Sequence, residues 1–386
     1  MNQWIKTRLG DIIETNKNTY SSREQWSFVN YLDTGNIVKN KIDEIQYIDL
    51  TIKKLPSRAK RKAKYNSIIY STVRPDQHHH GIIKEQPENF LVSTGFTVID
   101  VNCEKANPDY IYYVLSQNEI TEYLQRIGEQ SVSAYPSIKP LDIENLEITL
   151  PKLGIQNKIV NILSAIDGKI KNNIEINNNL EQQAQLIFKS WFIDFEPFGG
   201  ELPNDWILST LGNISIMNAG GDKPKIVSTV KTEVCPYPIY SNGLSNEGLY
   251  GYTNKPKISD ESVTVSARGT IGFVCLRHIP YVPIVRLVTL VPKTEIISAK
   301  YLYLWLKQLH IAGTGTTQQQ LTVPDFQKTE ILVPSNETMS IFTATVEPLY
   351  EKIWANQMEN DRLSWVRDTL LPKLMSGELD VSDIDL

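Results

Sequence analysis

Apolar residues recur at steps of three and four along two long stretches of the chain, residues 159–191 and 342–374. This spacing places them on one face of an α-helix, as in a pair of long helices that pack together. An asparagine interrupts each apolar face near its middle, at Asn173 and Asn356, which would fix the register of the pair at some cost in stability. The seam positions that we single out are Ile159, Ile166, Ile170, Leu180, Ile187, Leu349, Ile353, Leu363 and Leu370.

The chain outside these stretches contains short runs rich in β-branched and apolar residues, separated by Gly, Asn and Pro, which is typical of strands. The clearest runs are residues 90–101, 147–151, 262–276 and 284–292. Each half also contains one helical patch, at residues 108–127 and 298–309. The pattern therefore predicts two α+β domains.

The chain also repeats itself. WIKTRLGDI at 4–12 matches WILSTLGNI at 206–214, and DYIYYVLSQ at 109–117 matches KYLYLWLKQ at 300–308. Residues 138–151 match residues 321–334, and a long helical stretch follows each of these closing segments. A period near 190 residues is too long for a solenoid, so the repeat indicates a tandem pair of domains.

The order of segments is globular, helix, globular, helix, which favours an α+β fold with two duplicated domains separated by two long helices. Two helices separated by a globular domain pair most simply in antiparallel fashion. The alternative is that each helix belongs to a separate core. We place the segment boundaries at 1–151 for the first domain, 152–202 for the central helix and linker, 203–334 for the second domain, and 335–386 for the C-terminal helix and tail.

The net charge of −5 is unusual for a protein that binds nucleic acid. Residues 335–386 hold four basic and ten acidic side chains, whereas residues 203–334 hold 12 basic and nine acidic ones. Local basic surface, rather than whole-chain charge, governs affinity for DNA. Three distant cysteines without a CxxC pair argue against a disulfide framework or a zinc ribbon. Without a membrane span or an export signal in this sequence, we expect a cytoplasmic protein.

Residues 51–64 contain seven basic side chains and no acidic one, a composition that would attract backbone phosphates. The alternative is a solvated surface loop. The candidate DNA-binding residues here are Lys53, Lys54, Arg58, Lys60, Arg61, Lys62 and Lys64.

Residues 70–81 contain Arg and Gln, which can read base edges, together with Ser and Thr, which can hold phosphate. Three adjacent histidines within them suggest a metal site, but consecutive residues do not easily converge on one ion; a plain polar loop is the other alternative. The candidates here are Ser71, Arg74, Gln77, His78 and His79.

The second half has comparable segments rich in glycine, small and amide side chains. No phosphate-binding GxxxxGK[ST] motif occurs, and no GxGxxG motif opens a helix after a strand, so the glycines indicate turns or a DNA-facing loop. The candidates here are Tyr240, Asn242, Ser266, Arg268, Thr270, Gln318 and Gln319.

Catalytic templates are not matched. Asn107-Pro108-Asp109-Tyr110 differs by one residue from the NPPY box of adenine methyltransferases, and we interpret it as a helix start with Asn107 as the cap. Pro324 and Asp325 precede Glu330, but no ExK follows, which disfavours a PD-ExK nuclease. We therefore assign no catalytic residue and no metal ligand, and a complete enzyme is disfavoured.

Several segments, in this order, resemble the specificity subunits of type I restriction–modification enzymes. LLPKLMSGEL at 370–379 is similar to the LLPKLLSGE that ends those subunits, and WFIDF at 191–195 followed by LPNDW at 202–206 looks like their passage into the second domain. Residues 71–81 and 266–272 resemble their target-recognition segments. The resemblance covers essentially the whole chain.

The resemblance implies two target-recognition domains, each reading one half of a bipartite site in double-stranded DNA, with the paired helices setting the spacing. It implies two modification (methyltransferase) subunits docked on the helices, and motor–nuclease restriction subunits. S-adenosylmethionine, ATP and Mg²⁺ would belong to those partners, and none of these cofactors to this chain. The competing hypothesis is a coiled-coil scaffold with protein-binding ends, which predicts no salt-dependent affinity for DNA.

Overall fold

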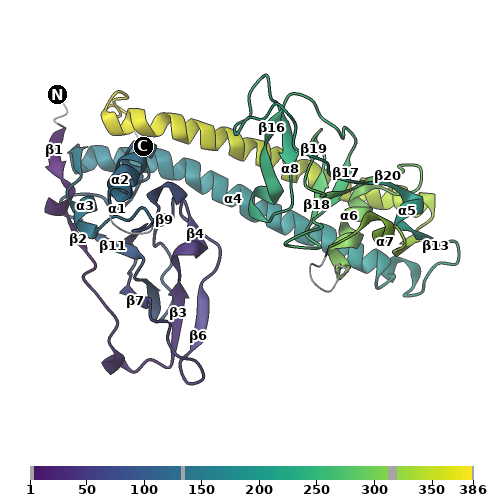
Figure 1. Cartoon of the computed structure of the whole chain (residues 1–386), viewed down its shortest axis with the longest axis horizontal. Coiled ribbons are helices and arrows are strands. Elements are labelled where there is room, and N and C mark those ends of the chain that lie inside the picture. Colours follow the sequence, from purple (N-terminus) through teal and green to yellow (C-terminus); the bar gives the residue numbers. More distant parts are fainter. Residues whose placement is uncertain (1–3, 132–134, 312–319, 385–386) are drawn as a thin grey trace. The chain divides into compact units, whose positions relative to one another are not determined.

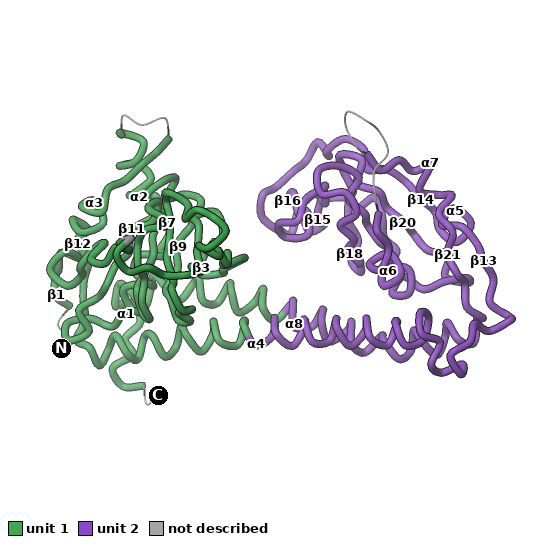
Figure 2. Tube along the Cα trace, turned by 90° about the horizontal axis from the view of Figure 1, so that it is seen from below, with its two compact units in different colours: residues 1–171, 359–386 green, residues 172–358 purple. Residues whose placement is uncertain are grey.

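The computed structural model describes residues 4–131, 135–311 and 320–384. These residues form two compact units, a first unit of residues 1–171 with 359–386 and a second unit of residues 172–358 (Figure 2). Two long helices, α4 (Leu153–Phe192) and α8 (Asn336–Ser376), each contribute to both units. The expected α+β fold with two globular parts and two long helices is confirmed.

The first unit contains two four-stranded sheets, a separate strand pair and a short hairpin (Figure 1). In sheet order the strands are β2 (Ile13–Thr15), β11 (Phe96–Val101), β8 (Ile68–Ser71) and β9 (His80–Ile82); β6 (Gln46–Asp49), β3 (Phe28–Leu32), β10 (Phe90–Ser93) and β7 (Ala59–Lys62); β1 (Ile5–Arg8) and β12 (Glu147–Leu150); β4 (Ile37–Val38) and β5 (Lys41–Ile42). The helices of its globular body are α1 (Pro108–Leu115), α2 (Asn118–Glu129) and α3 (Pro140–Glu144).

The second unit contains a four-stranded sheet, a three-stranded sheet and a separate strand pair. In sheet order the strands are β14 (Ser215–Ala219), β20 (Val288–Pro292), β17 (Ser262–Val265) and β18 (Val274–Arg277); β16 (Leu249–Thr253), β15 (Tyr237–Tyr240) and β19 (Val282–Pro283); β13 (Ile207–Thr210) and β21 (Glu330–Val333). The helices of its globular body are α5 (Leu211–Ile214), α6 (Ala299–Gln308) and α7 (Val323–Phe326).

The two units have the same topology. The sheet β2-β11-β8-β9 and the sheet β14-β20-β17-β18 place their strands in the same chain order. Each unit also contains a parallel pair, β3 with β10 and β15 with β19, in which the later strand leads directly into the central strand of the first sheet. The sequence repeat is therefore a repeat of topology. Strands β7, β4 and β5 are additions of the first unit, without a counterpart in the described part of the second.

The local predictions are mostly accurate. Asn107 caps α1, because its side-chain oxygen accepts hydrogen bonds from the backbone N–H groups of Asp109 (2.8 Å) and Tyr110 (3.3 Å). The helical patch expected at 108–127 consists of two separate helices, α1 and α2. The runs at 90–101 and 262–276 each contain two strands, and in the run at 284–292 only Val288–Pro292 form a strand, because the preceding residues form a turn.

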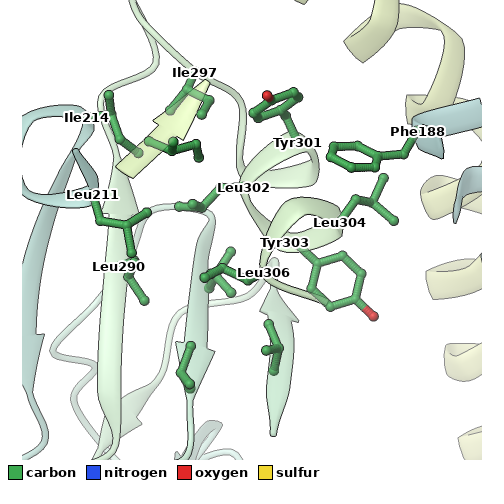
Figure 3. Close-up of a cluster of buried hydrophobic side chains, with 14 of the residues drawn as sticks. Phe188, Leu211, Ile214, Leu290, Ile297, Tyr301, Leu302, Tyr303, Leu304 and Leu306 are labelled. Atoms are coloured by element: carbon green, nitrogen blue, oxygen red, sulfur yellow. The ribbon is translucent and has the colours of Figure 1, made fainter. Parts of the chain in front are cut away.

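The core of the second unit forms around α6, which lies between the sheet and the two long helices (Figure 3). Leu302 of α6 faces Leu211 and Leu290, whereas Tyr301 faces Phe188 of α4 with a ring-centre distance of 5.4 Å. Tyr301 and Leu302 are both fully buried. A helix that is apolar on opposite faces is stable only when it is covered on both, so α6 joins the sheet to the helix pair.

The long helices run antiparallel within each unit, as expected. In the first unit, Asp167 of α4 accepts a hydrogen bond from Arg367 of α8 (2.9 Å) and another from the Tyr113 hydroxyl of α1 (2.7 Å). In the second unit, the side-chain amide of Asn356 donates to Asn177 Oδ1 (2.8 Å), and the Asn177 amide donates to the Ile353 carbonyl (3.2 Å). Polar pairs thus accompany the apolar seam in both units.

The predicted seam residues differ in their burial. Ile159 and Ile353 are buried, and the remaining seam positions are half-buried. Asn173 and Asn356 are each only 1% exposed, so both predicted interruptions lie inside the seam. The four-segment division of the chain remains a prediction: β12 and β21 end just before α4 and α8 begin, but each helix is shared between the two compact units.

We predict that Asn356→Ala destabilises the second unit. The change removes the hydrogen bond that the buried Asn356 amide donates to the half-buried Asn177 side chain, and such a hydrogen bond contributes about 0.5–1.5 kcal/mol. Urea unfolding of the full chain measures the loss. Asn178→Ala, at an exposed position of the same helix pair, is the control and should change stability by less than about 0.5 kcal/mol. Equal losses from both variants would contradict a specific role for the asparagine pair.

Candidate nucleic-acid interface

The basic segment at 51–64 does not present all of its charges to solvent. In strand β7, Ala59 is buried, Lys60 is exposed, and Arg61 and Lys62 are half-buried. The guanidinium of Arg61 donates to Asn16 Oδ1 (2.5 Å) and to the backbone carbonyl of Phe96, and burial lowers the pKa of this guanidinium. Arg61 therefore ties β7 to the start of β11, and its charge faces the protein.

The remaining basic side chains of this segment differ in whether they face a carboxylate. Lys62 forms an ion pair with Glu24 and lies over the ring of Trp26, and Lys64 Nζ is 3.8 Å from Asp100. Arg58 is exposed; burial raises the pKa of Asp33, but the hydrogen bond from the Thr34 backbone N–H and, to a smaller extent, the charge of Arg58 lower it, and the net shift is downward. Within the described residues, three exposed lysines of this segment form no ion pair: Lys53, Lys54 and Lys60.

Residues 71–79 are largely occupied by contacts within the first unit. The hydroxyl of Ser71, which is 2% exposed, donates to the Val73 carbonyl (2.9 Å). Arg74 has a left-handed backbone (φ +49°), and its guanidinium lies 4.3 Å from the ring centre of Tyr135. His79 Nδ1 donates to the Ile37 carbonyl (2.7 Å), with Gln77 Oε1 3.1 Å from Nε2. Among the candidates of this segment, Gln77 is exposed, whereas Arg74, His78 and His79 are half-buried.

The three adjacent histidines differ in their surroundings. Burial lowers the pKa of His78, and it lowers the pKa of His80 to about 3, so His80 is neutral. His80 is 2% exposed and stacks on Tyr70 with ring centres 5.4 Å apart. In the described ranges, no three His, Cys, Asp or Glu side chains lie close enough together to hold a metal ion.

The second unit has an open hollow of 620 Å³ between two loops. One loop supplies small residues and an exposed aromatic ring, and the other supplies Arg268, Gly269 and Thr270. Arg268 is exposed and donates to Gln320 Oε1 (2.9 Å). The hollow thus combines small side chains with one guanidinium, from two of the segments singled out in the sequence, and their contact with DNA stays a prediction. The residues that line it are Ser241, Asn242, Gly243, Leu244, Ser245, Gly248, Leu249, Tyr250, Arg268, Gly269 and Thr270.

The other candidates of the second unit have internal partners. Ser266 is 1% exposed, and the ring of Tyr240 lies 3.6 Å from the buried guanidinium of Arg277. The Asn242 amide donates to the Val285 carbonyl (2.6 Å), and its oxygen accepts from the Ala267 backbone N–H (2.7 Å). Gln318 and Gln319 lie outside the described residues.

Sequence reasoning missed three exposed basic residues of the second unit, Lys255, Lys257 and Arg286. Lys255 and Lys257 are separated by one residue and Arg286 has no basic neighbour, so no long charge run marks these residues. Lys257 lies beside Gly221, whose carbonyl accepts a hydrogen bond from the backbone next to Arg286. The fold therefore brings the segment that contains Lys257 close to the turn that contains Arg286, although about 30 residues separate them in the sequence.

Comparison with known proteins identifies the family. Residues 1–182 and 203–362 match the family described as "Type I restriction modification DNA specificity domain". The chain therefore belongs to the type I restriction–modification DNA specificity family and contains two specificity domains, each including part of a long helix.

The relatives support this assignment over the full length. The chain is 27% identical to the HindI specificity subunit of Haemophilus influenzae, covering 98% of this chain and all of that protein. It is 28% identical to the MjaIX specificity subunit of Methanocaldococcus jannaschii, over 72% of this chain and 70% of that protein. A crystal structure of the S subunit from M. genitalium shares the fold, with a TM-score of 0.56, 19% identity, and coverage of 97% of this chain and 96% of that one.

The structure gives no indication of a membrane span: among the helices of the described residues, none is both long and apolar enough to cross a bilayer.

We predict that Arg61→Ala lowers stability, although the sequence grouped Arg61 with the phosphate contacts. Its loss leaves Asn16 Oδ1 and the Phe96 carbonyl without this donor, which should cost about 1–3 kcal/mol. Thermal and urea unfolding of the full chain check the expectation. Lys60→Ala, the exposed neighbour on β7, removes the same charge and should leave stability within about 0.5 kcal/mol. An Arg61→Ala protein as stable as Lys60→Ala would overturn this assignment.

Proposed function

We propose that the chain is a non-catalytic DNA reader in which each unit recognises one half of a bipartite double-stranded target. One observation carries the proposal: the two units repeat one topology but differ in the loops that follow equivalent strands. A common frame with different loops is suited to reading two different sequences. Family membership supports the same conclusion.

The chemistry of the chain supports a reader without its own reaction. Burial raises the pKa of the Cys275 thiol to about 12, so this cysteine does not supply a thiolate at neutral pH. Asn107 and Pro108, which resemble part of a methyltransferase box, cap and begin α1. S-adenosylmethionine, ATP and Mg²⁺ accordingly belong, in this proposal, to modification and motor–nuclease subunits.

The long helices supply surface for such partners. Large apolar side chains are exposed on both of them, with Leu186 of α4 65% exposed and Trp365 of α8 70% exposed. Contact with another protein would remove the apolar surface of these side chains from water. We propose that the modification subunits dock on the helices, and that the length of the helix pair sets the gap between the half-sites.

We predict that the two readers are separable. Replacing residues 205–334 with the corresponding domain of another specificity protein should change one half of the methylated sequence and preserve the other. The reason is that the strands and loops of the second globular body lie within this segment. Methylation mapping in cells that contain the whole system measures both halves. A swap that altered both halves would contradict separate readers.

We also predict that Lys53→Ala, Lys54→Ala and Lys60→Ala together reduce DNA affinity without changing sequence preference. The slope of log affinity against log salt should fall by roughly 0.9 for each phosphate that the variant no longer binds. Filter binding of the full complex at several salt concentrations gives the slope.

The control replaces Lys6, Lys17 and Lys189, which already face carboxylates, and should change the slope less. Equal slopes for both triple variants would place residues 51–64 away from DNA. If the unaltered complex showed no salt-dependent affinity, the scaffold alternative would replace the proposal.

A further inference from the structure

The turn between β19 and β20 has residues that rarely adopt its backbone conformation. The Leu287 N–H donates to the Ile284 carbonyl (3.1 Å), and the two residues between them have positive φ, +52° at Val285 and +61° at Arg286. Positive φ at both central positions is the geometry of a type I′ turn, where Asn-Gly or Asp-Gly is preferred. A β-branched residue such as Val285 is strained there.

The strain does not serve the core, because both side chains point to solvent. Val285 is 49% exposed and Arg286 is also exposed. Asn-Gly would close the same turn without strain and without removing a side chain from the core. Strained backbone persists where the surroundings hold it in place, and it concentrates at functional sites.

The surroundings hold this turn at several backbone groups. The N–H groups of Val285 and Arg286 donate to the carbonyls of Gly221 (2.9 Å) and Gly220 (2.8 Å). A Cβ at Gly220 would come within 2.8 Å of the Ile284 backbone, so only glycine permits this approach. The Asn242 side chain adds a further hydrogen bond, because its amide donates to the Val285 carbonyl (2.6 Å).

Asn242 also connects this turn to the hollow described above. Its oxygen accepts from the N–H of Ala267, the residue before Arg268, so one side chain holds both arginine-bearing loops. The first unit has a simpler arrangement at the equivalent place, where the Thr72 N–H donates directly to the Gly95 carbonyl (2.8 Å) in the turn between β10 and β11. The second unit therefore differs from its own duplicate at this point.

We propose that the turn formed by Val285 and Arg286 reads base edges in the half-site of the second unit, with Asn242 as a positioning residue. The proposal rests on the function proposed above and assigns one of its reading elements. An exposed Arg pairs with guanine O6 and N7 in the major groove, and a small apolar side chain contacts the methyl group of thymine. We therefore assign Arg286 to a guanine and Val285 to a neighbouring thymine.

The main test replaces Val285 and Arg286 together with Asn and Gly. The full chain, assembled with its modification subunits, is presented with randomised double-stranded DNA, and the selected sequences are read. The double variant should melt at a higher temperature, because the strain is relieved. It should also lose about 5- to 150-fold discrimination at one or two positions of one half-site, the range that a bidentate contact provides.

Single-residue variants separate the contributions of Arg286, Val285 and Asn242 to the base preference. Arg286→Ala should lose the guanine preference, and Arg286→Lys should recover part of it, whereas Val285→Ala should weaken only the thymine preference. Asn242→Asp keeps the acceptor for Ala267 but cannot donate to Val285. It should therefore weaken the base preference at the same positions of the half-site as Arg286→Ala. Lys255→Ala removes one exposed charge from the same unit and is the control, with lower affinity at most and unchanged base preferences.

The outcomes distinguish this inference from the proposed function. A more stable Asn-Gly variant that selects the same bases as the unaltered complex would show that the turn is structural, and would overturn the inference alone. Failure of the unaltered complex to select a bipartite sequence would refute the proposed function itself. If the double variant did not fold, an unchanged base preference in Arg286→Ala would still be decisive against the inference.

Discussion

Every part of this protein depends on the burial of one short helix in each unit between a sheet and the pair of long helices. In the second unit, α6 presents Leu302 to the sheet and Tyr301 to Phe188 of α4, and Phe342 of α8 closes the cluster. In the first unit, α1 uses the Tyr113 hydroxyl to reach Asp167, which also binds Arg367 of α8. Because these short helices are apolar on both faces, the long helices are part of each core as well as a connection along the chain.

A consequence of this arrangement is that the reading loops are separated from the parts that provide stability. The strand order of the first sheet is the same in both units, and the units differ in the loops that follow these strands and in the added strands β4, β5 and β7. At one such place the first unit joins Thr72 to Gly95 directly, whereas the second inserts the Asn242 side chain and a strained turn. A strained segment is tolerated there because the core, formed elsewhere, holds the ends of both strands.

The charged residues show where local sequence is an incomplete guide. Residues 51–64 form one basic run in the sequence, yet Arg61 binds Asn16 and Lys62 binds Glu24, so only part of the charge faces solvent. Arg286 has no basic neighbour in sequence but is exposed on a turn. Strand pairing brings together side chains that are tens of residues apart in the sequence. The number of charges along the sequence therefore does not show which of them form ion pairs.

The sequence by itself determined the features that depend on local periodicity and on comparison of the chain with itself. These are the two long helices with Asn173 and Asn356 in their seams, the capped start of α1, the duplication, and the α+β class. Only the tertiary structure decided which charges face the protein, and that the apolar run at 284–292 turns at Val285 and Arg286. The physical reason is that this turn contains no Gly, Asn or Pro, since distant carbonyls of Gly220 and Gly221 and the amide of Asn242 impose its backbone.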